Sequence, residues 1–182
     1  MSRLVLNSAD PFPREISQKF FKKNPKKFSS SVAMDVSVTS PAGEQQNISR
    51  AELLKKSAMT VLYFYPRDDT PGCTVEGIEF SGILGDLEKM GVQVVGVSRD
   101  SHDSHCKFAS KHDLKISLIS DADQELHEKF DVIREKKMYG KTVLGPVRST
   151  FLLDSTGEIL KEWRNIRAGG HAQKVLDFVR GL

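Results

Sequence analysis

Residues 59–65 read Met-Thr-Val-Leu-Tyr-Phe-Tyr, a continuous run of apolar and β-branched side chains. Such a run is typical of a strand that is buried on both faces of a sheet. A short polar segment, residues 66–74, follows it. Apolar residues then recur at the i, i+3, i+4, i+7 spacing of an amphipathic helix, at Phe80, Ile83, Leu84 and Leu87. The sequence therefore predicts a buried strand, a short loop and a helix packed on the sheet.

The rest of the chain alternates in the same way on both sides of this unit. Short apolar runs predict strands at 92–97, 116–119, 149–153 and 159–163, the last two joined by a turn at 154–157. Helical spacing predicts helices at 101–112, around 126–130 and at 172–179. This order is typical of an α/β fold with a central mixed sheet and helices on both faces. We expect the compact domain to span residues 32–182.

The N-terminal arm differs in composition from the rest. Residues 1–30 hold seven basic and two acidic residues, net +5, whereas the whole chain carries +3. No secretory apolar stretch occurs there, so we expect a cytoplasmic protein. Phenylalanines among the lysines would suit a membrane surface or nucleic acid, but Pro25 interrupts any long amphipathic helix. We expect residues 1–31 to be a flexible or peripherally docked extension, without a nucleic-acid or membrane partner.

Length and composition exclude several classes of protein. The chain has 182 residues, 38% of them hydrophobic and 28% charged, which is typical of a globular domain. No apolar run approaches the roughly 18 residues of a membrane span. A chain of this length folds without disulfides, so its two cysteines are either core residues or chemically reactive.

Cys73 lies where a helix is expected to begin. Thr70 followed by Pro71 predicts an N-cap and a first helical residue, which puts Cys73 in the first turn. Unpaired N–H groups and the helix dipole stabilise a thiolate there, and the thiolate is the nucleophilic form. A helix terminus stabilises a nearby negative charge by only ~0.3–1 kcal/mol. This is too little to make the thiol a reactive thiolate at neutral pH, so a cationic side chain must also lie near the sulfur. The residues alone also allow Cys73 to be a small buried apolar side chain.

The pattern Pro66-x-x-x-Thr70-x-x-Cys73 resembles the active-site motif of the peroxiredoxins. The wider segment YFYPRDDTPGCTVEGIEF is similar to the peroxiredoxin Q branch, also called bacterioferritin comigratory protein. Similar segments follow in order over residues 32–182: GVSRDS (96–101), FDVIREKKMYGK (130–141) and VLGPVRSTFLL (143–153). The resemblance implies a thioredoxin-like fold and the reduction of hydrogen peroxide and organic hydroperoxides. It also implies recycling by thioredoxin or a similar dithiol, and a monomeric protein. No metal or organic cofactor is expected.

The resemblance also assigns roles at the site. Cys73 matches the peroxidatic cysteine, whose thiolate attacks the O–O bond and becomes a sulfenic acid. Thr70 matches the hydroxyl that binds the thiolate and the peroxide, and Pro66 the residue that shields the sulfur from water. Arg148 matches the family arginine, which would supply the second cation and stabilise charge on the peroxide oxygens.

The second cysteine departs from the family pattern. Many members have a resolving cysteine five residues after the first, where this chain has Ile78. Another subgroup has it at the position that we align with Ala109, three residues after Cys106. Either Cys106 resolves the sulfenic acid, or an external thiol does, and we favour Cys106. A disulfide needs Cα atoms about 4.4–6.8 Å apart, so we expect local unwinding to precede it.

Two further interpretations start from other residues. His102, His105 and Cys106 suggest a metal site, but structural zinc needs four ligands, so we favour a solvated helix face on which His105 influences the Cys106 thiol. The other is a redox-controlled binding module, with Cys73 as sensor and the basic arm as the contact to its partner. The chain has no Cys-x-x-Cys motif, which argues against a disulfide reductase.

Overall fold

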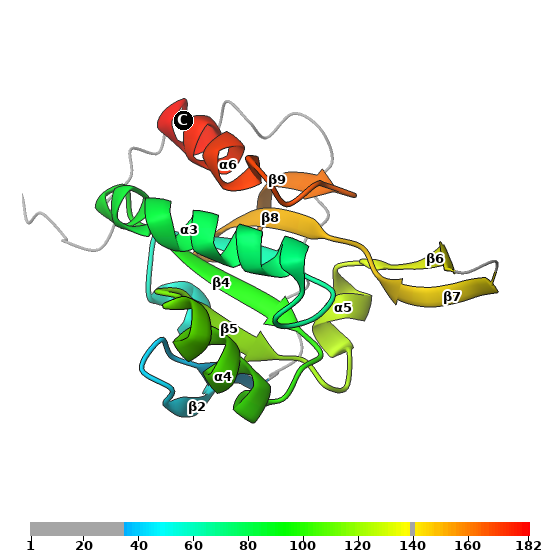
Figure 1. The fold of residues 1–182 in the computed structure, drawn as a ribbon. Helices are drawn as coiled ribbons and strands as arrows, with labels where there is room; N and C mark the ends of the chain where they lie inside the picture. The colour runs from blue at the N-terminus through cyan, green and yellow to red at the C-terminus, as the bar shows by residue number, and fades with distance from the viewer. Residues whose placement is uncertain (1–34, 139–140) are drawn as a thin grey trace, which may run out of the picture.

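A seven-stranded mixed sheet forms the centre of the computed structural model, which describes residues 35–138 and 141–182. Its strand order is β2-β1-β5-β4-β3-β8-β9 (Figure 1). β3, β4 and β5 pair in parallel, and the other pairs are antiparallel. The strands are β1 (Asp35–Thr39), β2 (Gln45–Ser49), β3 (Met59–Phe64), β4 (Val92–Ser98), β5 (Ser117–Ser120), β8 (Ser149–Asp154) and β9 (Ile159–Arg164).

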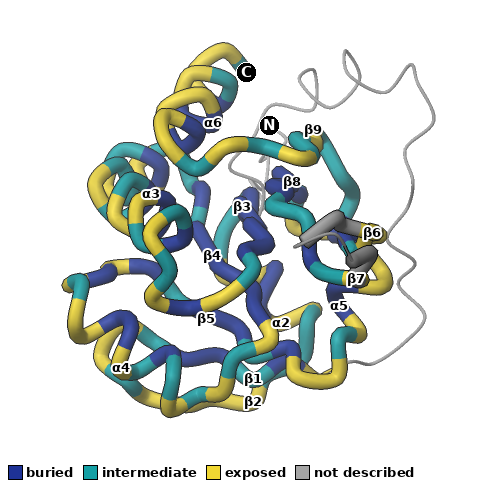
Figure 2. Tube along the Cα trace, turned by 45° about the vertical axis from the view of Figure 1, so that its right-hand side comes forward, coloured by how far each residue is buried: buried dark blue, intermediate teal, exposed yellow. Residues whose placement is uncertain are grey.

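Helices cover both faces of this sheet, as the sequence predicted. One hydrophobic cluster contains residues of α3 (Pro71–Lys89), α4 (His102–His112) and α6 (His171–Arg180). The other contains residues of α2 (Arg50–Lys55) and α5 (Glu125–Lys129). Figure 2 shows the buried strands in the middle and the exposed residues on the outer sides of the helices. The predicted α/β class is confirmed.

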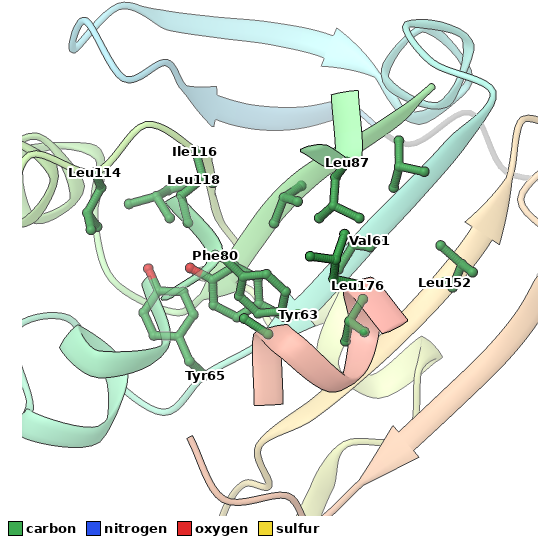
Figure 3. Packing of buried hydrophobic residues seen from close by; sticks show 14 of the residues in the cluster. Val61, Tyr63, Tyr65, Phe80, Leu87, Leu114, Ile116, Leu118, Leu152 and Leu176 are labelled. Atoms are coloured by element: carbon green, nitrogen blue, oxygen red, sulfur yellow. The ribbon is translucent and has the colours of Figure 1, made fainter. Parts of the chain in front are cut away.

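The central strand β3 has all six residues buried, and its side chains alternate between the two clusters. Val61 and Tyr63 belong to the cluster under α3, whereas Leu62 and Phe64 belong to the other. The Tyr63 ring stacks on Phe80 of α3 with centroids 4.8 Å apart (Figure 3). On the neighbouring strand, a Cβ at Gly96 would lie 2.8 Å from the Tyr63 ring, so glycine allows this close packing.

The predicted strands and helices from residue 59 onward are confirmed, with small shifts at their ends. β1, β2 and α2 were not predicted from the sequence, nor was the hairpin of β6 (Ile133–Met138) and β7 (Lys141–Pro146). β2 and β6 are polar strands without the apolar runs that marked the others. The β6–β7 hairpin forms its own two-stranded sheet and projects from the central one (Figure 1).

The basic extension predicted for residues 1–31 lies outside the described residues. In the segments that are described, none of the helices combines the length and the apolar composition that a membrane span requires.

Replacing Phe80 by alanine tests the core under α3. Its side chain is fully buried, so Phe80→Ala should lower the free energy of unfolding by ~3–5 kcal/mol through lost contacts and a cavity. Urea denaturation of the purified protein measures this. Ile78→Ala is the control on the same helix, because Ile78 is 48% exposed and should change stability by less than about 1 kcal/mol. Equal losses for the two variants would contradict this packing.

Candidate active site

The loop between β3 and α3 determines where Cys73 lies. Thr70 is the N-cap of α3, with extended backbone angles, and Pro71 is the first helical residue, as predicted. The Thr74 N–H donates to the Thr70 carbonyl at 2.9 Å and closes the first turn. Cys73 therefore lies in that turn, and only 1% of its surface is exposed. A thiol at this position lies next to the positive end of the helix dipole.

Arg148 reaches the same place from a distant part of the sequence. In the antiparallel pair of β3 and β8, Phe64 is opposite Ser149, so Arg148 lies beside the end of β3 where the loop begins. Its Nη2 atom donates to the Cys73 sulfur at 3.2 Å. A Cβ at residue 72 would lie 3.2 Å from the same Nη2, so Gly72 leaves room for the guanidinium.

Glu76 is a further site residue, one that the sequence motifs did not indicate. It lies one helical turn after Cys73, its side chain is fully buried, and one of its oxygens accepts a hydrogen bond from Nη1 of Arg148. Burial raises the pKa of Glu76 to about 7, although Arg148 acts to lower it. A signal was available: extending the apolar stripe of α3 backward by one turn from Phe80 reaches Glu76, a carboxylate on the core face.

The charge of Arg148 is stabilised by its two neighbours. Burial acts to lower its pKa, but the charges and hydrogen bonds of Glu76 and Cys73 outweigh this and raise it. The guanidinium is therefore a permanent cation in contact with the sulfur and the carboxylate. A thiolate at the start of a helix needs such a cation beside the sulfur.

The other two predicted residues lie in the same loop. Pro66 is half-buried at its start, and Thr70 is half-buried at its end. The Thr70 hydroxyl donates to the carbonyl of Arg67 at 3.1 Å, so it is turned toward the backbone of the loop. The structure thus brings Arg148 and Glu76 to Cys73, with Pro66 and Thr70 on the segment that leads to it.

Cys106 has a different environment on α4. Its half-buried sulfur lies 3.4 Å from Nε2 of His102 and 3.7 Å from the carbonyl of Gly43, in the turn between β1 and β2. Nδ1 of His102 is in turn 2.8 Å from the Thr39 hydroxyl. Both cysteines are free thiols. The aligned position Ala109 instead lies in the core cluster under α3 and α4.

His102 and His105 of α4 have separate partners. His102 contacts Cys106, whereas His105 is bound to Asp68, so His105 is not the imidazole next to the Cys106 thiol. In the part of the chain that the structure describes, no three His, Cys, Asp or Glu side chains are grouped to hold a metal ion.

The chain is similar to known proteins over most of its length. The model of the AhpC/TSA family matches residues 30–162. Peroxiredoxin Bcp of Xanthomonas campestris is 51% identical over 116 residues, which cover 64% of this chain and 72% of that protein. The putative peroxiredoxin bcp of Coxiella burnetii is 39% identical over 138 residues, covering 76% of this chain and 90% of that protein.

Solved structures show the same relationship. The structure of Xanthomonas campestris Peroxiredoxin Q has a TM-score of 0.71 and 42% identity, covering 81% of this chain and 90% of the other. That of a PrxQ mutant from Xylella fastidiosa has a TM-score of 0.78 and 36% identity, covering 87% and 96%. These neighbours confirm the thioredoxin-like fold. The chain belongs to the AhpC/TSA family and, within it, to the peroxiredoxins of the Bcp or PrxQ type, which are thiol peroxidases.

Proposed function

We propose that Cys73 is the peroxidatic cysteine of this chain and that it reduces hydrogen peroxide and organic hydroperoxides. The observation that carries the proposal is the Arg148 guanidinium 3.2 Å from the Cys73 sulfur, at the start of α3. The helix terminus and the guanidinium both favour the thiolate. A structure of the Xanthomonas bacterioferritin comigratory protein is described in terms of alkyl peroxide reduction, which supports the second substrate class.

The chemistry is a displacement on the peroxide. The Cys73 thiolate attacks one peroxide oxygen, an S–O bond forms and the O–O bond breaks. The other oxygen leaves as hydroxide or alkoxide and takes up a proton, which yields water or an alcohol and a sulfenic acid on Cys73. Arg148 stabilises negative charge as it moves from sulfur to oxygen. Pro66 shields the sulfur from water, and the Thr70 hydroxyl turns from the Arg67 carbonyl to the peroxide.

Cys106 is proposed to resolve the sulfenic acid. Its thiolate attacks the Cys73 sulfur, a disulfide forms, and hydroxide leaves and is protonated to water. The His102 imidazole beside the Cys106 sulfur is placed to take the thiol proton. Because the Cys106 sulfur faces the β1–β2 turn, helix α4 or the loop before α3 must move first. Thioredoxin or a similar dithiol then reduces the disulfide. A monomeric state and a cytoplasmic location stay predictions.

The burial of Glu76 makes the stability of the fold depend on pH. The pKa of Glu76 is about 7 in the folded chain and 4.5 as the ordinary value. Between pH 4.5 and about 7, Glu76 is ionised in the unfolded chain but still holds its proton in the folded chain. The unfolded state therefore binds fewer protons, and a rise in pH across this range lowers the free energy of unfolding. Above about pH 7 the folded carboxylate is also ionised, and Arg148 pairs with it, so the loss ends there.

Cys73→Ser tests the peroxidatic role. Peroxide consumption with thioredoxin, thioredoxin reductase and NADPH should fall to the background rate, because a hydroxyl does not form the nucleophilic anion at neutral pH. Cys106→Ser with dithiothreitol as reductant is the control and should keep its activity. Activity in Cys73→Ser, or a wild-type rate no faster than that of free cysteine, would reject the peroxidase assignment to this residue.

Arg148→Met tests the buried ion pair. Without the cation the Glu76 pKa should rise further, so the stability loss should continue above pH 7. We expect the free energy of unfolding to fall, relative to wild type, by up to about 1.4 kcal/mol per pH unit in that range. Urea denaturation at pH 6, 7, 8 and 9 measures it. The double variant Arg148→Met, Glu76→Gln should lack the extra slope, and an unchanged slope in the single variant would contradict the pairing.

Cys106→Ser tests the resolving step. Peptide mass spectrometry of the wild type after one equivalent of peroxide should show a Cys73–Cys106 disulfide. The variant should lose most of its turnover with thioredoxin. If the wild type yields only Cys73 sulfinic acid or mixed disulfides, and the variant turns over normally, an external thiol resolves the enzyme.

A further inference from the structure

Asp68 connects the loop before α3 to helix α4. Its side chain is buried, and one carboxylate oxygen accepts a hydrogen bond from the Tyr65 hydroxyl at 2.7 Å. The other oxygen accepts from the Ser104 hydroxyl at 2.7 Å and lies 2.9 Å from Nδ1 of His105. Tyr65 precedes the loop, whereas Ser104 and His105 belong to α4. The Asp68 carboxylate therefore joins two elements that neighbour each other only in the fold.

These groups depend on one another because they are shielded from water. The His105 ring is fully buried, and its Nε2 atom has no hydrogen-bond partner in the described segments. Burial raises the pKa of Tyr65 well above its ordinary value, so the phenol stays neutral and donates to Asp68. A buried carboxylate that loses its donors is strongly destabilised. We therefore expect the hydrogen bonds of the Asp68 carboxylate to form and break together, as the loop moves toward or away from α4.

Further contacts hold the loop before α3 to Asp100, which precedes α4, and to α4 itself. The Asp68 N–H donates to the Asp100 carboxylate at 2.9 Å, which also accepts from the Ser98 hydroxyl at 2.8 Å. Asp69 makes a second connection to α4, through Lys111 at 2.6 Å and His112 at 2.7 Å. The Asp69 side chain is 45% exposed, so water and salt screen its ion pairs. The chain thus contains a buried and an exposed connection side by side.

The contacts between the loop before α3 and helix α4 bear on which reaction the oxidised Cys73 undergoes. The sulfur is buried, and a second peroxide molecule is small enough to reach a site that already admitted the first. A resolving thiol on α4 or on another protein must instead bring its own Cα within about 4.4–6.8 Å. We expect the loop to separate from α4 before that contact forms.

We propose that Asp68 is the positioning residue that holds this loop closed against α4, and that the breaking of its hydrogen bonds governs how oxidised Cys73 is divided between resolution and overoxidation. In resolution, the sulfenic acid and a thiol give a disulfide and water. In overoxidation, the sulfenic acid and a second hydroperoxide give a sulfinic acid and water or an alcohol. The proposal rests on Cys73 being peroxidatic, and it holds whichever thiol resolves.

Asp68→Asn is the decisive variant, because it keeps the shape of the side chain and removes its charge. One equivalent of peroxide generates the sulfenic acid in the presence of thioredoxin, and dimedone trapping followed by mass spectrometry counts what remains with time. We expect the sulfenic acid of the variant to be resolved about tenfold faster, since hydrogen bonds to charged groups contribute at least that factor. The sulfinic acid formed per turnover should fall accordingly. Asp69→Asn, the matched control, should stay within about twofold of wild type for both quantities.

Ser104→Ala is a milder second variant, which removes one donor from the same carboxylate and should shift both quantities in the same direction. It decides the matter if Asp68→Asn fails to fold. The proposal is overturned if Asp68→Asn and Ser104→Ala resolve the sulfenic acid at the wild-type rate and form as much sulfinic acid per turnover as the wild type. It is also overturned if Asp69→Asn changes these two quantities as much as Asp68→Asn does. A purely structural role would lower the unfolding midpoint and leave this division unchanged. Failure of the Cys73→Ser test is a separate result, because it concerns peroxide consumption and not resolution.

Discussion

The guanidinium of Arg148 lies between the sulfur of Cys73 and the carboxylate of Glu76, and the position of each group depends on a different part of the fold. The register between β3 and β8 places Arg148. The N-cap at Thr70 places Cys73 in the first turn of α3, and helical spacing places Glu76 one turn later. A buried cation is stable only with such partners, because desolvation opposes its charge. The ion pair therefore joins the sheet to the start of α3.

Burial sets the chemistry of this site in two ways. It excludes water from the sulfur, which strengthens the interaction with Arg148. It also raises the pKa of Glu76 to about 7. Below neutral pH the carboxyl is therefore mostly uncharged, and it competes only weakly with the sulfur for the guanidinium of Arg148. Within the loop before α3, Asp68 makes buried contacts with α4, next to the half-exposed ion pairs of Asp69. The segment that leads to Cys73 thus also carries these contacts with α4.

Local patterns were sufficient for much of the fold. The apolar runs of β3 and β4 and the helical spacing of α3 and α6 belong to elements whose faces are buried, so their periodicity is visible in the sequence. β2 and β6 are polar, and pairing with a neighbouring strand stabilises them more than burial does, so no hydrophobic pattern marked them. Helix α2 has a capping box between Ser49 and Glu52, a local signal that was available and overlooked.

For this protein, the sequence by itself determined the α/β class, the start of α3 at Thr70 and Pro71, and the place of Cys73 in its first turn, because each depends on neighbours a few residues apart. The peroxiredoxin motif also pointed to Arg148, but only the tertiary structure showed its contact with Cys73 and its pairing with Glu76. The contact of His102 with Cys106 joins residues four apart on α4, so helical spacing by itself allows it. The tertiary structure also decided that His105 binds Asp68. These contacts depend on strand register and on the rotation of α4 about its axis. Both are set by packing between segments far apart in the chain, which a local pattern does not encode.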